Sequence, residues 1–101
     1  MTVMVIYEVT AVVEPALSEA YEVFMIEHHI PDLLKTGCFE TASLERSTPG
    51  RYRIRYAARD RESLDRYFAE HATRLRQDFG AHFPDGAELS REEWNVIKQF
   101  A

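Results

Sequence analysis

The chain has 101 residues, 46% of them hydrophobic and 29% charged, which is typical of one globular domain spanning residues 1–101. Its net charge of −5 disfavours nonspecific binding to nucleic acid or to an anionic membrane, so we expect neither as a partner. A single cysteine excludes a disulfide within the chain, and the N-terminus lacks the pattern of a signal peptide or membrane span, so we expect a cytoplasmic protein.

The first third of the chain predicts a strand followed by a helix. In residues 3–13 large, mostly apolar side chains alternate with a mixed set at a period of two, and β-branched residues are frequent. This pattern is typical of a strand covered on both faces. The helix that follows carries an apolar stripe at helical spacing, formed by Leu17, Ala20, Tyr21, Phe24 and His28. We expect this helix to end near Ile30, because the residue before a proline avoids helical geometry. A short turn then leads to Gly37.

Residues 38–47 and 51–59 predict a hairpin of two strands. A three-residue loop ending at Gly50 places Glu45 opposite Arg53, Leu44 opposite Ile54 and Ala42 opposite Tyr56. A two-residue turn would instead place Arg46 opposite Arg53, and two like charges side by side are unfavourable. The sequence therefore favours the three-residue loop.

The last part of the chain predicts a second helix and a final strand. Asp60 is a suitable helix cap, and an apolar stripe follows it at Leu64, Tyr67, Phe68, His71, Leu75 and Phe79. A turn at 85–86 precedes a strand that runs through Trp94, Val96 and Ile97. Its alternation breaks at 91–93, where we expect a bulge or an irregular edge.

The predicted order is therefore β-α-β-β-α-β. With right-handed crossovers, this order gives a ferredoxin-like α+β sandwich, in which a four-stranded antiparallel sheet carries both helices on one face. The first and third strands are expected to be central.

The sheet face opposite the helices predicts a homodimer of the α/β-barrel type. This face combines apolar side chains of the first strand with charged side chains of the hairpin, which suits neither water nor a dry core. A second copy would cover it, and most soluble oligomers are symmetric homo-oligomers. We expect an ion network there, formed by Glu8, Glu45, Arg53 and Arg55. In the alternative interpretation, these arginines bind a carboxylate inside the barrel.

Several segments together resemble a family of short bacterial proteins of unknown function. They are "IYEVTAVV", "HIPDLLKTGCF", the strand 51–58, "YFAEHATRLR" and the final tryptophan strand. The resemblance covers nearly the whole chain and implies the fold of the dimeric α/β-barrel proteins, which include cofactor-free monooxygenases and lactone-pathway isomerases. It directs attention to His29, Cys38 and His71. The chain departs from the family pattern at Thr73, where the family has proline, and in its doubled histidine.

The histidines have two interpretations. His29 and His71 begin similar segments, "HIPDLL" and "HATRLR", so each can interact with the carbonyl groups at a helix C-terminus. Alternatively, His28 or His29 lies with His71 beside a cavity between helices and sheet. Tyrosine hydroxyls would then line the same cavity, with Tyr7 and Tyr56 as the leading candidates among Tyr7, Tyr21, Tyr52, Tyr56 and Tyr67. Cys38 is a further candidate, although a cysteine at the start of a strand is usually a buried small hydrophobe.

The sequence predicts no metal site and no cofactor. Successive helical residues point about 100° apart, so Glu27, His28 and His29 cannot converge on one ion within a regular helix. The leading hypothesis is that a small aromatic or acidic molecule binds in a helix–sheet or barrel cavity. The alternatives are a cofactor-free enzyme of the monooxygenase or isomerase type and a purely structural dimer. A cavity with an apposed histidine and tyrosine would favour the enzyme, and the absence of a cavity of about 300 Å3 would favour the structural dimer.

Overall fold

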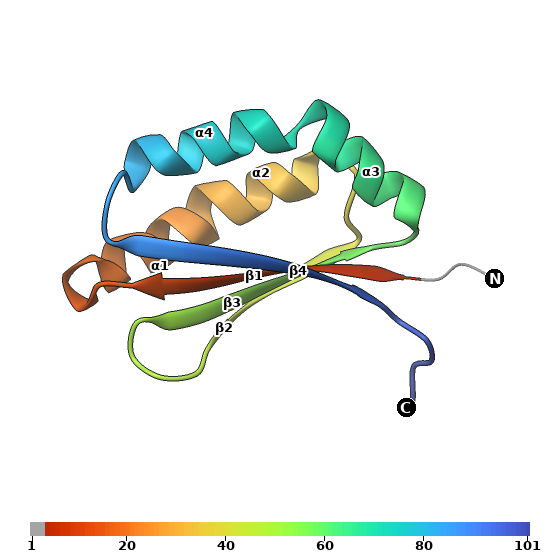
Figure 1. Cartoon of the computed structure of the whole chain (residues 1–101), viewed down its shortest axis with the longest axis horizontal. Helices are drawn as coiled ribbons and strands as arrows, with labels where there is room; N and C mark the ends of the chain where they lie inside the picture. The colour runs from red at the N-terminus through yellow and green to blue at the C-terminus, as the bar shows by residue number, and fades with distance from the viewer. Residues whose placement is uncertain (1–3) are drawn as a thin grey trace.

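In the computed structural model, which describes residues 4–101, a four-stranded antiparallel sheet carries every helix on one face (Figure 1). The strands are β1 (Val5–Val13), β2 (Thr41–Arg46), β3 (Arg51–Ala58) and β4 (Ala87–Asn95), in the order β2-β3-β1-β4. The helix layer comprises η1 (Pro15–Leu17), α1 (Ser18–Phe24), η2 (Met25–His29), α2 (Ile30–Lys35), α3 (Arg61–Glu70) and α4 (Ala72–His82). The first and third strands are central, so the predicted ferredoxin-like α+β sandwich is confirmed. The expected strand start at residue 3 lies outside the described residues.

The hairpin of β2 and β3 has the predicted register. Glu45 lies opposite Arg53, and the pairs Leu44–Ile54 and Ala42–Tyr56 follow as expected. Gly50 ends the loop with a φ of 83°, a conformation that side chains other than glycine's rarely adopt. A Cβ at this position would lie 2.6 Å from the carbonyl oxygen of Val13, so glycine is also required by the close approach to β1.

The first helix does not end before Pro31, which corrects the sequence prediction. The helix continues through η2 and α2 to Lys35, and Pro31 lies in the first turn of α2. η2 is a π-helical turn, in which the N–H of Ile30 donates to the carbonyl of Met25 five residues earlier. This wider turn gives the proline ring room beside the preceding carbonyls, because the ring would clash with the carbonyl four residues earlier in a regular α-helix.

The second predicted helix is divided at His71. Asp60 caps α3 as expected, and its carboxylate accepts a hydrogen bond of 2.8 Å from the N–H of Ser63. His71 has non-helical dihedrals, and α4 begins at the next residue. Position 73, where the resembling family has proline, is therefore in the first turn of a new helix, the part of a helix that accepts proline.

The expected bulge in β4 is wrong. β4 pairs with β1 without interruption from Ala87 to Asn95, and the strand ends before Val96 and Ile97. The alternation of apolar and polar residues in the sequence breaks because charged residues of β4 face the helix layer. Glu93 forms an ion pair there with Arg61 of α3, and Arg91 lies opposite Val9, whose side chain packs against the core.

One hydrophobic core lies between the sheet and the helix layer. The strand residues predicted to face the helices all contribute to it, with Val5, Tyr7, Tyr52, Ile54 and Tyr56 buried and Val9 and Leu44 half-buried. The other sheet face, which we call the open face, carries Met4, Ile6, Glu8, Thr10, Val12, Arg53, Arg55 and Trp94. None of the helices within residues 4–101 combines the length and apolar content needed to cross a bilayer.

Candidate functional site

A small cavity lies between the helix layer and the helix-facing side of the sheet. Its inner part is lined by Tyr21, His29, Tyr56 and Tyr67, and its outer part by Arg76 and Arg91. The cavity volume is about 30 Å3, which is room for about two water molecules. Pockets that hold drug-sized ligands occupy roughly 300–1,000 Å3, so the enclosed space admits only a small chemical group.

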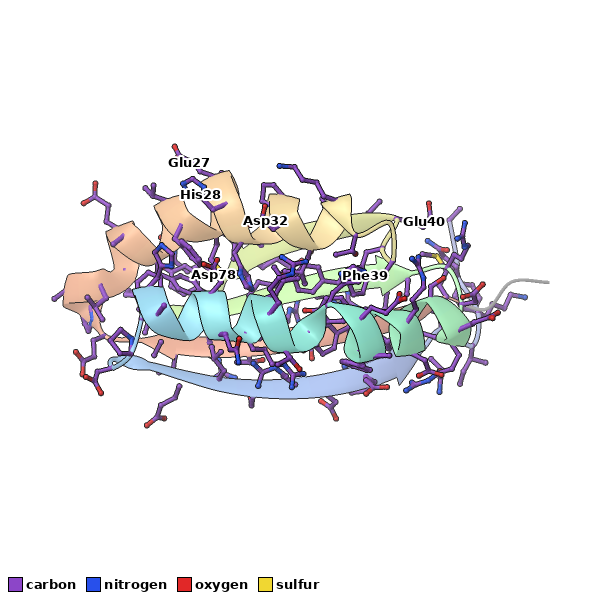
Figure 2. The ribbon with its side chains drawn as sticks, turned by 90° about the horizontal axis from the view of Figure 1, so that it is seen from above. Glu27, His28, Asp32, Phe39, Glu40 and Asp78 are labelled. Carbon is purple, nitrogen blue, oxygen red and sulfur yellow. The ribbon has the colours of Figure 1, made fainter. Side chains whose placement is uncertain are left out.

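The π-helical turn places His29 at this cavity and His28 outside it. His29 is half-buried, and its ring packs between Phe24 and Phe79, with ring centroids 5.6 Å from each. His28 is exposed, and Figure 2 shows Glu27 beside it at the outer edge of the helix layer, turned away from α4. π-helical turns occur frequently at functional sites, so this local irregularity supports a role for the inward histidine.

Two residues that line the cavity each have a buried polar atom with no hydrogen-bond partner within the described part of the chain. These atoms are Nδ1 of His29 and the hydroxyl of Tyr21. Both side chains line the cavity. An unpaired buried polar group costs about 1–3 kcal/mol, so two of them at one cavity point to a partner from outside the chain.

The interior of the site is electrically neutral at physiological pH. Burial lowers the pKa of His29, against the opposing charges of Asp78 and Asp32, while Arg91 and His82 lower it further. In Figure 2 Asp32 and Asp78 lie on the sides of α2 and α4 that face each other. Burial also raises the pKa of three lining tyrosines, so each keeps its hydroxyl proton: Tyr21, Tyr56 and Tyr67. The site therefore offers hydroxyl donors beside a neutral imidazole.

The open face holds the charged contacts that the register of the hairpin brings together. Arg53 lies 3.6 Å from Glu8 and 2.6 Å from Glu45, and Arg55 lies 3.7 Å from Glu8. The indole N–H of Trp94 also donates to Glu8, at 3.1 Å. Both arginines already have carboxylate partners, which leaves them less suited to hold an anionic ligand. Among residues 4–101, no group of three or more His, Cys, Asp or Glu side chains is arranged to hold a metal ion.

Residues 4–97 match the family described as Domain of unknown function (DUF4286). The chain belongs to this family. Among curated proteins, none matches the sequence.

Solved structures resemble this DUF4286 chain at low sequence identity. SnoaB, a cofactor-independent oxygenase from Streptomyces nogalater, has a TM-score of 0.71 at 13% identity, with 96% of each chain covered. A protein of unknown function from Nitrosomonas europaea has a TM-score of 0.73 at 10% identity, covering 99% of this chain and 95% of its own. A putative antibiotic biosynthesis monooxygenase from Caulobacter crescentus has a TM-score of 0.67 at 15% identity, covering 96% and 92%. At these identities the likeness shows a shared fold.

The structure brings together only part of the predicted site of this DUF4286 chain. Tyr7, Tyr56 and His29 line the same cavity. His28 is exposed, and His71 lies at the junction of α3 and α4, outside the cavity lining. Cys38 is buried outside this lining too, with its sulfur 3.9 Å from the carbonyl of Thr36. Of the predicted histidine pair, only His29 therefore reaches the cavity.

Sequence analysis missed the two arginines at the outer part of the cavity. The signal for Arg91 was present, because the alternation of the last strand breaks there, but we attributed the break to a bulge. Arg76 follows Leu75 on α4, and a charged residue beside the apolar stripe of a helix is ordinarily exposed to solvent. Its sequence context therefore gave no signal.

Proposed function

We propose that this chain binds a small organic molecule in the cavity between the helix layer and the sheet. The observation that carries the proposal is that two residues lining one cavity each have a buried, unpartnered polar atom, namely His29 Nδ1 and the Tyr21 hydroxyl. A ligand with a donor and an acceptor would satisfy both atoms and offset the cost of burying them. The small enclosed volume limits what enters to one small polar group of the ligand.

A titration with acetamide, a small neutral molecule with one donor group and one acceptor, tests this proposal. We expect chemical-shift changes in the 1H–15N spectrum at residues lining the cavity, with an affinity in the millimolar range because so few atoms make contact. Tyr21→Phe and His29→Gln are expected to weaken the binding several-fold. His28→Gln, a change at the exposed neighbouring histidine, is the matched control and should bind as the wild type does.

The same variants separate binding from a structural role. Tyr21→Phe removes an unpartnered hydroxyl and is expected to leave the free energy of unfolding unchanged or to raise it. Tyr52→Phe, by comparison, removes a 2.5 Å hydrogen bond to Glu22 and is expected to cost about 1–2 kcal/mol. Acetamide binding that is unaltered by both Tyr21→Phe and His29→Gln would contradict the proposal.

A catalytic form of this function is favoured by the neutral state of His29. An imidazole that is neutral near pH 7 can accept a proton from a bound molecule, and the lining tyrosines can donate hydrogen bonds to the anion that results. SnoaB is a cofactor-independent oxygenase of the same fold. A cofactor-free reaction would be detected as turnover that is lost in His29→Gln and retained in His28→Gln.

We also propose that two copies pair through their open faces. The face combines half-buried apolar residues, Met4 and Ile6, with exposed Val12 and Trp94, and burial of such surface contributes about 25 cal/mol per Å2. It carries both Glu8 and the arginines of β3, so a twofold axis can bring opposite charges together. The small cavity volume is the observation that favours a purely structural dimer as the alternative function.

A further inference from the structure

Two arginines form the outer part of the cavity, and neither has an acidic partner. Arg76 is on α4, and Arg91 is on β4. Among residues 4–101, no carboxylate lies within 4.0 Å of either guanidinium group, whereas five of the eight other arginines form such pairs: Arg46, Arg53, Arg55, Arg59 and Arg61. The chain has 17 acidic residues and only 12 basic ones, so acidic partners are not scarce.

Protein contacts hold Arg76 over the cavity. Its guanidinium group donates to the hydroxyl of Tyr7 at 3.2 Å, and it lies 6.0 Å from the centre of the Phe68 ring. These contacts fix the position of the group without neutralising its charge. Donor capacity of the guanidinium remains free for a ligand, because the group carries five N–H bonds.

Arg91 reaches the cavity from the opposite side. It lies across from Val9 on the helix-facing side of the sheet, between Leu89 and Glu93 on the same side of β4. Its charge acts on His29, and the charges of Arg76 and Arg91 both act on Tyr67, where they oppose the rise in pKa that burial causes. Both positive charges are therefore directed at the cavity interior.

We propose that Arg76 and Arg91 select a small monocarboxylate, whose carboxylate binds at the outer part of the cavity while its short polar remainder extends toward His29 and Tyr21. This inference rests on the proposed function, since it names the class of molecule that the cavity binds. Guanidinium groups match the planar geometry of a carboxylate and bind it with charge-assisted hydrogen bonds.

The volume of the cavity favours a short acid over an aromatic one. About 30 Å3 accommodates roughly two non-hydrogen atoms beyond the arginines. An aromatic ring has six such atoms, so it would remain outside. A tetrahedral phosphate is larger than a carboxylate, so it also fits the small cavity less well.

Acetate and acetamide, which have nearly the same shape and differ in charge, test the inference. At constant ionic strength, we expect the wild type to bind acetate at least tenfold more tightly than acetamide, as measured by 1H–15N chemical-shift titration. Arg76→Gln with Arg91→Gln should lower acetate affinity at least tenfold and leave acetamide affinity unchanged. Arg74→Gln, on the same helix but outside the cavity lining, is the matched control and should bind acetate as the wild type does.

The possible outcomes distinguish this inference from the proposed function. Equal affinity for acetate and acetamide in the wild type would overturn the inference and leave the proposed function standing. An equal loss of acetate binding in Arg74→Gln would show a general effect of surface charge and would also overturn it. Inorganic phosphate binding more tightly than acetate would reject the carboxylate class. If neither acetate nor acetamide shifts the cavity resonances, both the inference and the proposed function are wrong.

Discussion

His28 and His29 are neighbours in the chain, but His28 is exposed, whereas the ring of His29 packs between Phe24 and Phe79. Burial lowers the pKa of His29 from its ordinary value of 6.5. The unfolded chain therefore binds this proton more readily than the folded chain, and protonation favours unfolding. We expect the free energy of unfolding to fall as the pH drops below about 6.5, by about 1.4 kcal/mol for each unit by which the pKa is lowered.

Urea unfolding between about pH 7.5 and pH 5.5 measures this effect, in a range above the ordinary pKa of carboxylates. In His29→Gln the loss of stability over this range should become smaller. The groups that face His29 are Asp32 on α2, Asp78 and His82 on α4, and Arg91 on β4, and the variant keeps all of them. His28→Gln should keep the pH dependence of the wild type. An unchanged pH dependence in His29→Gln would show that His29 does not cause it.

Only part of the site could be predicted, because the sequence gives the residue types but not the orientations of their side chains. Tyr7 and Tyr56 were predictable, since their strands alternate and one side of each strand is apolar. The choice between His28 and His29 stayed open, because helical periodicity places His28 in the apolar stripe while the π-helical turn directs His29 to the cavity. Arg91 was missed because a charged residue on the helix-facing side of an edge strand interrupts the hydrophobic alternation in the same way as a bulge does.

At the scale of elements, the π-helical turn and Pro31 depend on each other. Glu27 is exposed, so its deletion removes no buried contact and should convert η2 into regular α-helix. Pro31 would then lie inside a regular helix, where it lacks an N–H donor and its ring clashes with the carbonyl four residues earlier. We expect deletion of Glu27 to lower the free energy of unfolding by about 3 kcal/mol.

Combining that deletion with Pro31→Ala provides the control. The double variant should recover most of the lost stability, because alanine fits a regular helix and restores the N–H donor. Pro31→Ala in the undeleted chain should change the free energy of unfolding by less than about 1 kcal/mol, since the wider turn already accommodates the proline. If the deletion alone proves as stable as the wild type in urea unfolding, the two features are independent.

The elements that were predicted well are those for which any other arrangement has a clear energetic cost. The hairpin register follows from the unfavourable pairing of Arg46 with Arg53, and the structure has the predicted register. The first helix was truncated too early, because a proline usually ends a helix and no sequence rule announces a π-helical turn. The break at His71 has no glycine or proline to mark it, so the apolar stripe ran through it.

At the scale of the whole molecule, the order of elements was sufficient to predict the architecture. The right-handed crossovers leave one arrangement in which β1 and β3 are central and the helices share one face. Within residues 4–101, the same arrangement leaves the open face uncovered by any helix or strand (Figure 1). The segment after β4 also extends to that side of the sheet, with Ile97 98% exposed and Phe100 82% exposed. These apolar side chains add to the surface that a second copy would bury.

Two isoleucine substitutions test the proposed pairing of open faces. Ile6 lies on the open face between Ala57 and Trp94, and Ile26 is 60% exposed on the helix layer. Light scattering at micromolar concentration is expected to give the mass of a dimer for the wild type and for Ile26→Arg. Ile6→Arg would place an unpaired charge in the interface at a cost of several kcal/mol, so we expect the mass of a monomer. A monomeric wild type would reject the dimer, and a dimeric Ile6→Arg would place the interface on another surface.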